Sequence, residues 1–502
     1  MPSGVRLMPA GAPGWGPAIV DAWGEAGSPA CGDLVTVQVR VSGGRVTDAG
    51  YRAQGCRATH DAADAACAAL RGATLDQALQ VSEASIARDL GQAPVGDGHA
   101  AGMVADAVAE AFEQWFGARL GTSGPPPRPG RVAVAMSGGV DSAVAALLLS
   151  QQGHDVVGVT MRLWHDPVAS PARRSCCAPE TVRMARDTCA AIGIPHLTID
   201  AADRFRREVV EEFARGYAEG RTPNPCITCN GEVRFRILSE AAALLGAHHL
   251  ASGHYARTGT VPARGQSQPG DSPGPGTVPV VARSADFAKD QSYMLARLEP
   301  GILERLLLPL GGMTKDEVRA IAVRHGLPAA DAVESQDVCF VGEGGYGPFL
   351  ERHAGLGARP GRIVDQHGAV LGMHDGHWRY TVGQRRGLGV AAREPLYVLA
   401  TDARRNEVVV GPRAALGRQR IELAAMVVHA APDHALDVRI RHHGRLLRGH
   451  LLITGDATGE VVLEDAAEAV APGQTAALYD EGRLVAAGTI TRAHPARIGT
   501  ED

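Results

Sequence analysis

One stretch of the chain constrains its fold more than any other: an apolar strand, a glycine turn and an apolar helix follow one another over residues 132–149. The strand Val132–Met136 leads into the turn Ser137–Ser142 (SGGVDS), and the helix continues over Ala143–Leu149. A glycine turn that opens a helix directs free backbone N–H groups and the positive end of the helix dipole at an anion. The turn has neither the Gly-Lys-Ser/Thr of a Walker loop nor the Gly-x-Gly-x-x-Gly of a dinucleotide fingerprint. It is therefore either a phosphate-binding loop of a different class or an ordinary turn between a strand and a helix.

Strands and helices keep alternating after this turn. The pattern predicts strands over residues 156–161, 196–199 and 249–251 and helices over 179–192 and 204–217. Such alternation is typical of an α/β fold with a doubly wound parallel sheet. From Gly361 onward the segments are short, strand-like and bounded by turns, which predicts a small central domain and a C-terminal β-barrel. The low-complexity stretch 258–279 predicts a mobile surface insert.

The N-terminal part of the chain has a different pattern. Residues 34–41 and a second run ending at Ala53 alternate as strands around a Gly43-Gly44 turn, and helices follow over 58–70 and 103–116, which predicts a small α+β domain. The Pro/Gly stretch 121–130 is typical of a linker. We therefore expect an α+β domain 1–120, the linker 121–130, a phosphate-binding domain 131–345, a central domain 346–412 and a barrel 413–502.

Composition narrows the class of protein. A net charge of -5 and a pI of about 6.4 exclude a uniformly basic coat, but not a local basic groove. The sequence has no apolar run long enough to span a bilayer and no signal-peptide layout at its N-terminus, so we expect a cytoplasmic protein without a membrane segment. Nine cysteines among 502 residues are too few for a disulfide scaffold, and their clustering favours metal binding or thiol chemistry.

Cys226 and Cys229 lie three positions apart in the stretch 220–230 (GRTPNPCITCN). A cysteine just before a helix is favoured as a thiolate by the helix dipole, and the neighbouring Arg221 and Arg234 act in the same direction. The plainer interpretation is a pair of buried structural thiols, but two prolines and polar flanks are poor core material. A third thiol, Cys339, stands in the stretch 334–343 (ESQDVCFVGE).

These motifs occur together in a known family. From residue 131 to about 490 the chain resembles the tRNA-specific 2-thiouridylases of the PP-loop ATP-pyrophosphatase superfamily. The resemblance is carried by the turn 137–142 and by VTMRLW (159–164), the 220–230 stretch, SGHYAR (252–257), KDQSY (289–293), the Cys339 segment and YTVGQRRGLG (380–389). It implies an enzyme that uses ATP to adenylate the C2 oxygen of the wobble uridine in tRNA and then inserts sulfur, with release of AMP and pyrophosphate.

The resemblance also implies roles for individual residues. Cys229 matches the catalytic nucleophile and Cys339 the persulfide-bearing cysteine. The ATP site matches Ala135, Met136, Ser137, Gly138, Gly139, Val140, Asp141, Ser142, Met161 and Gly253, with Asp141 helping to place Mg²⁺. The target base matches Asn224, Pro225 and Cys226. The tRNA contacts match Lys289, Asp290, Gln291, Arg441, His442 and Gln474. Apart from the resemblance, the basic side chains of Arg385, Arg386, Arg439 and Arg441 are candidates for the tRNA backbone, and a solvated surface charge is the equal alternative for each.

One position departs from the family pattern, because Cys226 stands where the family commonly has aspartate. Cys226, Cys229 and Cys339 could together hold a [4Fe-4S] cluster that carries the sulfur, since such clusters are ligated by cysteine sulfur. The alternative keeps Cys229 and Cys339 as a persulfide and disulfide pair, and a zinc site is the third. The sequence leaves these alternatives open.

Residues 31 to about 116 resemble the NifU-like iron–sulfur scaffold family, through Cys31, Asp33, Cys56 and the stretch GATLDQA (72–78). His99 fits beside the family's third cysteine, whose own position is Ala100. The implied ligands for a cluster, iron or zinc are therefore Cys31, Asp33, Cys56 and His99. A domain that lacks the third thiolate could also dock a cysteine desulfurase, relay sulfur, or be kept for structure alone.

Two other functions compete with tRNA thiolation. A PP-loop amidotransferase-type ligase would use ammonia as its nucleophile, and the grouped thiols speak against it. A non-catalytic iron–sulfur or sulfur carrier would need no working ATP loop, and the complete 137–142 turn speaks against that. The sequence therefore predicts a tRNA sulfurtransferase fused to a scaffold-like domain, with a cysteine desulfurase or sulfur-relay protein as its donor.

Overall fold

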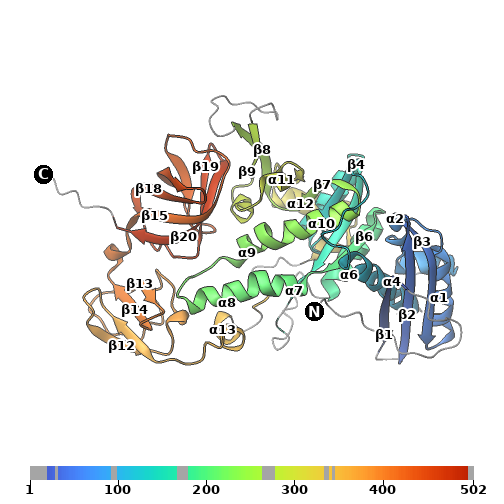
Figure 1. Ribbon diagram of the computed structural model, residues 1–502, viewed down its shortest axis with the longest axis horizontal. Helices are drawn as coiled ribbons and strands as arrows, with labels where there is room; N and C mark the ends of the chain where they lie inside the picture. The colour runs from blue at the N-terminus through green and yellow to red at the C-terminus, as the bar shows by residue number, and fades with distance from the viewer. Residues whose placement is uncertain are drawn as a thin grey trace. The chain divides into compact units, whose positions relative to one another are not determined.

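The computed structural model describes residues 20–28, 32–91, 99–164, 166, 179–262, 277–332, 338–341 and 345–495. The chain divides into two compact units, Met1–Ala118 and Arg119–Asp502, and Figure 1 labels their elements. No helix in these described ranges is long and apolar enough to cross a membrane.

The first unit is a three-stranded antiparallel sheet, in the order β1-β2-β3, packed against helices. Its elements are β1 (Ala22–Ser28), β2 (Asp33–Ser42), β3 (Arg45–Gln54), α1 (Arg57–Leu70), α2 (Leu75–Ala78), α3 (Glu83–Asp89) and α4 (His99–Gly117). The predicted α+β domain is confirmed. The pattern misses β1, whose sequence AWGEAGS is rich in residues with low strand propensity and which is a strand because it pairs with β2.

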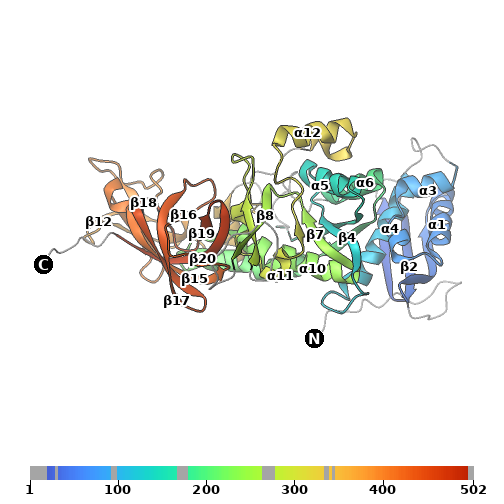
Figure 2. The ribbon, with the colours of Figure 1, turned by 90° about the horizontal axis from the view of Figure 1, so that it is seen from above.

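The second unit is built on a five-stranded parallel sheet in the order β10-β7-β4-β5-β6. Its strands are β4 (Arg128–Ala135), β5 (Asp155–Arg162), β6 (His196–Asp200), β7 (Ala247–Ser252) and β10 (Leu306–Leu307). Helices α5 (Val140–Gln151) and α6 (Pro179–Ile192) cover one face and α10 (Phe235–Leu244) covers the other (Figure 2). The predicted doubly wound sheet is confirmed. Because the strand order reverses at β4, a ligand crevice is expected where β4 and β7 end side by side.

Short helices connect these elements and carry the thiol motif. They are α7 (Ala202–Phe205), the π-helix η1 (Arg206–Val210), α8 (Glu211–Ala218), α9 (Pro225–Thr228), the π-helix η2 (Cys229–Arg234), η3 (Ser292–Leu295), α11 (Pro300–Leu303), α12 (Lys315–Arg324), η4 (Pro328–Asp331) and α13 (Tyr346–Ala354). The helix predicted over 204–217 is α7, η1 and α8 in succession. Single π-helical turns of this kind are rare and occur often at functional sites.

Two β-modules complete the second unit and confirm the predicted central domain and barrel. The central sheet, in the order β12-β11-β14-β13, consists of β11 (Gly361–Val364), β12 (Val370–His374), β13 (Tyr397–Asp402) and β14 (Glu407–Gly411), with the short helices η5 (His377–Arg379) and η6 (Arg413–Leu416) beside it. The barrel consists of β15 (Arg418–Val428), β16 (Leu436–Arg439), β17 (Leu447–Gly455), β18 (Thr458–Ala467), β19 (Thr475–Asp480) and β20 (Arg483–His494). It is closed because β15 pairs with both β18 and β20.

Two segments differ from the sequence expectation. Both ends of the stretch predicted as a surface insert form a hairpin of β8 (Ala256–Pro262) and β9 (Thr277–Arg283), while residues 263–276 lie outside the described residues. In the stretch 121–130, Gly124 lies against α10, where an added Cβ atom would meet the carbonyl oxygen of Ala243 at 1.9 Å, and Arg128 already begins β4. Tertiary contacts therefore order segments whose local composition is typical of loops.

Candidate functional site

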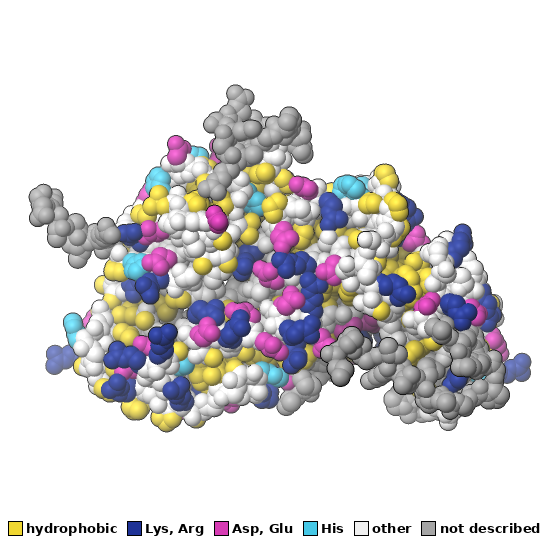
Figure 3. Space-filling model, in the orientation of Figure 1, with side chains coloured by type: hydrophobic (Ala, Val, Ile, Leu, Met, Phe, Trp, Pro, Cys, Tyr) yellow, Lys and Arg dark blue, Asp and Glu magenta, His cyan; other side chains and the backbone are white. Residues whose placement is uncertain are grey.

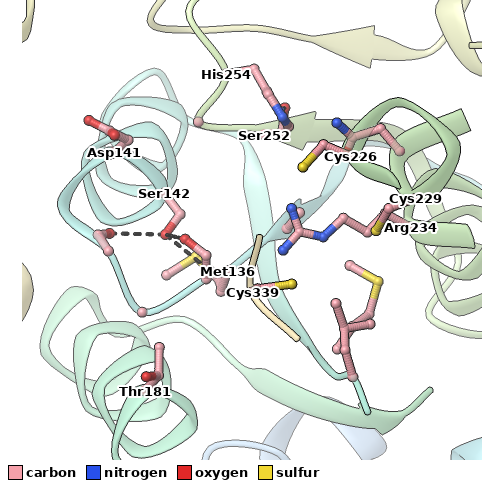
Figure 4. A pocket seen from close by; sticks show the side chains of 18 of the residues that line it. Met136, Asp141, Ser142, Thr181, Cys226, Cys229, Arg234, Ser252, His254 and Cys339 are labelled. Carbon is pink, nitrogen blue, oxygen red and sulfur yellow. Dashed lines mark hydrogen bonds between the residues drawn. The ribbon is translucent and has the colours of Figure 1, made fainter. Parts of the chain in front are cut away.

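A cavity of about 720 Å³ lies where β4 and β7 end (Figure 4). The predicted ATP residues Ala135 to Ser142, Met161 and Gly253 all line it. The same cavity is lined by Pro225, Cys226, Cys229, Lys289, Gln291 and Cys339. The fold therefore brings the phosphate-binding turn and the three thiols, which are far apart in the sequence, to one chamber.

The turn is shaped by two serines and a glycine. The Ser142 hydroxyl donates to the Gly139 carbonyl oxygen at 3.0 Å and accepts from the Ser137 backbone N–H at 3.2 Å. Gly138 has φ +72°, and a Cβ atom there would lie 2.4 Å from the Thr181 carbonyl oxygen of α6. The turn is therefore held open for an anion at the N-terminus of α5.

Gly253, which directly follows β7, lies in close contact with the backbone of this turn. A Cβ atom at this position would lie 2.7 Å from both the carbonyl carbon of Asp141 and the backbone nitrogen of Ser142. Such distances essentially never occur for real Cβ atoms. Gly253 thus lines the cavity and also allows β7 to approach the start of α5.

Asp141, in the first turn of α5, is held by groups from two other segments. Its Oδ1 and Oδ2 lie 2.7 and 2.9 Å from Nζ of Lys315, the first residue of α12. The Tyr255 hydroxyl donates to Oδ1 at 2.8 Å. Gln291 holds Tyr255 in turn, because its side-chain oxygen accepts from the Tyr255 N–H at 2.9 Å and its own N–H donates to the Tyr255 carbonyl at 2.8 Å.

The thiol motif begins a helix. Asn224 is the N-cap of α9, accepting from the Cys226 N–H at 3.1 Å, and Pro225 is the first helical residue. Cys229 then begins the π-helix η2 and is buried, whereas Cys226 and Cys339 are partly exposed. Asn224 is thus engaged in capping, and Pro225 and Cys226 are the predicted base-contacting residues that face the cavity.

The three thiols are separate. Cys226, Cys229 and Cys339 are all free, so the expected disulfide is not supported. Figure 4 shows their sulfur atoms spaced around the cavity, with Cys226 and Cys229 on one helical stretch and Cys339 on another segment. A tetrahedral zinc ion, with Zn–S bonds of about 2.3 Å, needs sulfurs about 4 Å apart. Among the described residues, the ligand atoms of these cysteines do not all lie within 4.8 Å of one another. A zinc site on this trio is therefore not supported by the geometry.

Two basic side chains complete this part of the cavity. Figure 4 shows Arg234, the last residue of η2, reaching into the chamber that holds the three thiols. His254 lies on the β7 side, within 2.9 Å of the Ser252 hydroxyl. Burial, with a contribution from Arg234, lowers the pKa of His254 to about 3, so its imidazole is neutral near pH 7.

A second group of ligand-type residues lies in the first unit. Asp33, Cys56 and His99 each place one ligand atom within 4.8 Å of the others. Asp33 Oδ2 accepts from the Thr59 hydroxyl at 2.6 Å and from the Cys56 N–H at 3.3 Å, and lies 3.9 Å from His99 Nε2. The hydrogen bond from Thr59 keeps the pKa of Asp33 below its usual value. The donor set of oxygen, sulfur and imidazole nitrogen suits a transition-metal ion.

Comparison with known proteins covers both units. Family models match residues 16–120 (NifU-like N terminal domain), 130–343 (tRNA methyl transferase HUP domain), 348–412 (tRNA methyl transferase PRC-barrel domain) and 421–490 (Aminomethyltransferase beta-barrel domain). The bifunctional protein NifU/MnmA of Rubrobacter xylanophilus is 41% identical over 93% of this chain and 94% of its own length. The chain belongs to the bifunctional NifU/MnmA family.

The thiolation part of this NifU/MnmA chain also has stand-alone relatives. The tRNA-specific 2-thiouridylase MnmA of Acidithiobacillus ferrooxidans is 44% identical over 71% of this chain and 97% of its own length. That of Roseiflexus castenholzii is 42% identical over 72% of this chain and 99% of its own length. Although the matching HUP model carries a methyltransferase description, these curated relatives are named thiouridylases.

In the NifU-like domain of this NifU/MnmA chain, the described residues supply only part of the ligand set predicted for a cluster or metal ion. Cys31 lies outside the described residues. Ala100, at the third cysteine position, is buried in α4 and offers no ligand atom.

The residues predicted to contact tRNA differ in exposure: some line the cavity, one lies on the surface and others are buried. Lys289 and Gln291 line the cavity and Arg441 is exposed. Asp290 is buried and accepts from Ser284 N, Ser292 N and Arg439. The prediction that Arg439 binds the tRNA backbone is therefore corrected. The Arg439 side chain is only 9% exposed and forms an ion pair with Asp290 at 3.0 Å, so it is not available to tRNA.

Two further residues of this group bind other parts of the protein. The Gln474 side chain donates to the Thr222 carbonyl at 2.6 Å, which joins the barrel to the segment before α9. His442 stacks on Tyr293, and burial lowers its pKa to about 4. On the face shown in Figure 3, arginines and acidic residues are interleaved. Glu212, which forms ion pairs with Arg215 and Arg221, is an example of such mixed charges.

Sequence reasoning about this NifU/MnmA chain missed several cavity residues, among them Glu180, His254, Tyr255 and Lys315. His254 and Tyr255 stand inside the SGHYAR string, which could have indicated them. Lys315 is 174 positions from Asp141 and lies in no motif, so no local pattern could have indicated it.

Proposed function

We propose that this chain is an ATP-dependent tRNA uridine 2-sulfurtransferase. The observation that carries the proposal is the single cavity that holds the phosphate-binding turn and the three thiols. The relatives named tRNA-specific 2-thiouridylase support the same reaction. The reaction belongs in the cytoplasm, where ATP and tRNA are available together.

The reaction has two halves: adenylation, which needs the phosphate-binding turn, and sulfur transfer, which needs the thiols. The C2 oxygen of uridine attacks the α-phosphorus of ATP, the bond to the β-phosphate oxygen breaks, and pyrophosphate leaves with the electron pair. A sulfane sulfur held on Cys339 then bonds to C2 while the C2–O bond breaks, and AMP leaves with the oxygen. The Cys229 thiolate, which faces the same cavity, then attacks the Cys339 sulfur. The bond between the two sulfurs breaks, its electron pair stays with the sulfur on C2, and a transient Cys229–Cys339 disulfide forms, which an external dithiol reductant must open before the next cycle. One difficult displacement is thus divided into easier steps.

The target base must leave its stack to enter such a cavity, as in other enzymes that modify bases. Pro225 and Cys226, at the start of α9, offer a rigid contact surface beside the thiols. The ring of His254, neutral because its pKa is lowered, offers a hydrogen bond without adding charge.

The residues present fit the expected inorganic groups to different degrees. The carboxylates of Asp141 and Glu180 line the cavity, and carboxylate oxygen is the ligand that Mg²⁺ prefers; the ion would neutralise phosphate charge. Three thiols facing one cavity also match the donor chemistry of a [4Fe-4S] cluster, with Cys226 as its additional ligand. In the first unit, Asp33, Cys56 and His99, with Cys31, would hold iron or zinc.

The sulfur must come from a donor protein, for which we propose a cysteine desulfurase or a sulfur-relay protein. A persulfide or a cluster sulfide is not supplied by ATP or by tRNA. The NifU-like domain supports this part of the proposal, because the family that it matches is fused here to a domain that needs sulfur.

The test combines unmodified tRNA transcript, ATP, Mg²⁺ and a cysteine desulfurase with cysteine, and measures pyrophosphate release and sulfur content of the tRNA. We expect both products with the wild-type chain, and no thiolated tRNA with Cys229→Ala although tRNA binding persists. Cys67→Ala is the matched control, since this thiol is buried in the first unit and burial raises its pKa to about 11.

Thiolation retained by Cys229→Ala would refute the assignment of that residue. Incorporation of nitrogen from ammonia in place of sulfur would instead establish the amidotransferase-type ligase. Iron and acid-labile sulfide measured on anaerobically purified protein distinguish the carriers: iron that is lost in Cys226→Ala indicates the cluster, and full activity without iron indicates the persulfide.

A further inference from the structure

Lys315 contacts the phosphate-binding turn from outside it. Its ammonium group lies 2.7 Å from Asp141 Oδ1, and its side chain is only 7% exposed. The backbone around it is well defined, because Thr314 and Glu317 form a capping box at the start of α12. Lys315 also lines the cavity, yet the reaction steps above give it no role.

The distribution of lysine in the chain makes this residue unusual. Lysine and arginine together number 50, and Lys289 and Lys315 are the two lysines among them. Both line the same cavity. Where a positive charge is needed elsewhere, this chain uses arginine. A lysine differs by its compact ammonium, which acts as a point charge and donates in three directions, whereas the guanidinium is a wide planar fork.

We infer that Lys315 binds the β- and γ-phosphates of ATP and stays bound to pyrophosphate as it leaves, with Asp141 and Tyr255 as its positioning residues. The inference rests on the proposed function, since it assigns the leaving group of the adenylation step. When the bond from the α-phosphorus to the β-phosphate oxygen breaks, negative charge increases on pyrophosphate. A fixed cation beside the turn stabilises that charge without reorganisation.

The charges around the turn support this assignment. The Asp141 carboxylate stands one residue beyond Val140, at the start of α5, where phosphate would bind. Alone, this carboxylate would repel a phosphate. Lys315 neutralises it, and the N-terminus of α12 adds a positive dipole end at the same place. The pair therefore turns a repulsive position into one that accepts an anion.

A purely structural ion pair is the competing explanation, because a buried ammonium needs a partner in any case. The two explanations differ in what the neutral pair would do. If the pair is only structural, replacing both charges restores the protein. If Lys315 binds phosphate, the neutral pair restores folding and not the affinity for pyrophosphate.

The test measures the binding of ATP, pyrophosphate and AMP to the full chain by calorimetry, in EDTA and without Mg²⁺, tRNA or sulfur donor, so that the magnesium role proposed for Asp141 does not contribute. We expect Lys315→Met to weaken ATP and pyrophosphate binding by about tenfold to a hundredfold, the equivalent of one charge-assisted hydrogen bond, and to leave AMP affinity within about twofold. Arg319→Met, which removes one charge from the exposed face of α12, is the matched control and should bind all three ligands normally.

The double variant Asp141→Asn/Lys315→Met guards against a folding defect. It should melt near the wild-type temperature and still bind pyrophosphate weakly. Wild-type pyrophosphate affinity in Lys315→Met or in the double variant overturns the inference, as does an equal loss of AMP and pyrophosphate affinity. A wild-type chain that binds no ATP contradicts the proposed function itself, which is a separate and recognisable result.

Discussion

The contact between Gly253 and the phosphate-binding turn allows the sharpest prediction, for the variant Gly253→Ala. The new Cβ atom would lie 2.7 Å from backbone atoms of Asp141 and Ser142. Ordinary van der Waals contact begins at 3.4 Å, so the end of β7 and the start of α5 must separate by about 0.7 Å. Neither neighbour is the flexible end of a side chain, so the strain cannot be relieved by a rotamer change.

Overpacking of this kind costs about 1–3 kcal/mol. We expect Gly253→Ala to lower the free energy of unfolding by this amount in urea titrations. Because the displaced atoms belong to the turn that binds phosphate, we also expect ATP affinity to fall at least about tenfold, which corresponds to about 1.4 kcal/mol. Calorimetric titration with ATP measures this second effect directly.

The control is Gly312→Ala, because a Cβ atom at Gly312 meets nothing within 4 Å. This variant should match the wild type in both stability and ATP affinity. If Gly253→Ala bound ATP as tightly as Gly312→Ala, the close approach of β7 to α5 would not matter for nucleotide binding, and the reasoning would be wrong.

Two further predictions concern pH and metal. Burial of His196 lowers its pKa to about 3, so the unfolded chain binds a proton below pH 6.5 that the native chain does not; stability is therefore full above that pH and falls as the pH decreases. His196→Gln should flatten this dependence by about 1.4 kcal/mol per pH unit between pH 6 and 4 in urea titrations, and an unchanged slope would contradict the assignment. His99→Ala removes one of the three convergent ligand atoms of the first unit, so iron or zinc retained after dialysis should fall by about tenfold or more. Elemental analysis checks this, with the exposed His325→Ala as control, and equal metal content in both variants would exclude His99 as a ligand.

The sequence by itself determined the parts of this protein that depend on neighbouring residues. The strand, turn and helix over 132–149 follow from local periodicity and glycine, and helix α6 begins and ends where the pattern predicts, at Pro179 and Ile192. Asn224 and Pro225 place Cys226 at a helix start for equally local reasons, since an N-cap and a first-turn proline act within one helical turn. These elements form in the folded protein as their local sequence predicts, because the tertiary contacts favour the same backbone conformations.

Only the tertiary structure decided which distant residues meet. Asp141 and Lys315 come together because α12 packs beside α5, and Asp290 is buried because Arg439 of the barrel reaches it across 149 positions. The strand β1 and the closure of the barrel depend on pairing with partners that have no signature in the local sequence. A local pattern reports the preferences of one segment, whereas ion pairing and strand pairing are energies shared between segments, which exist only when the chain has folded.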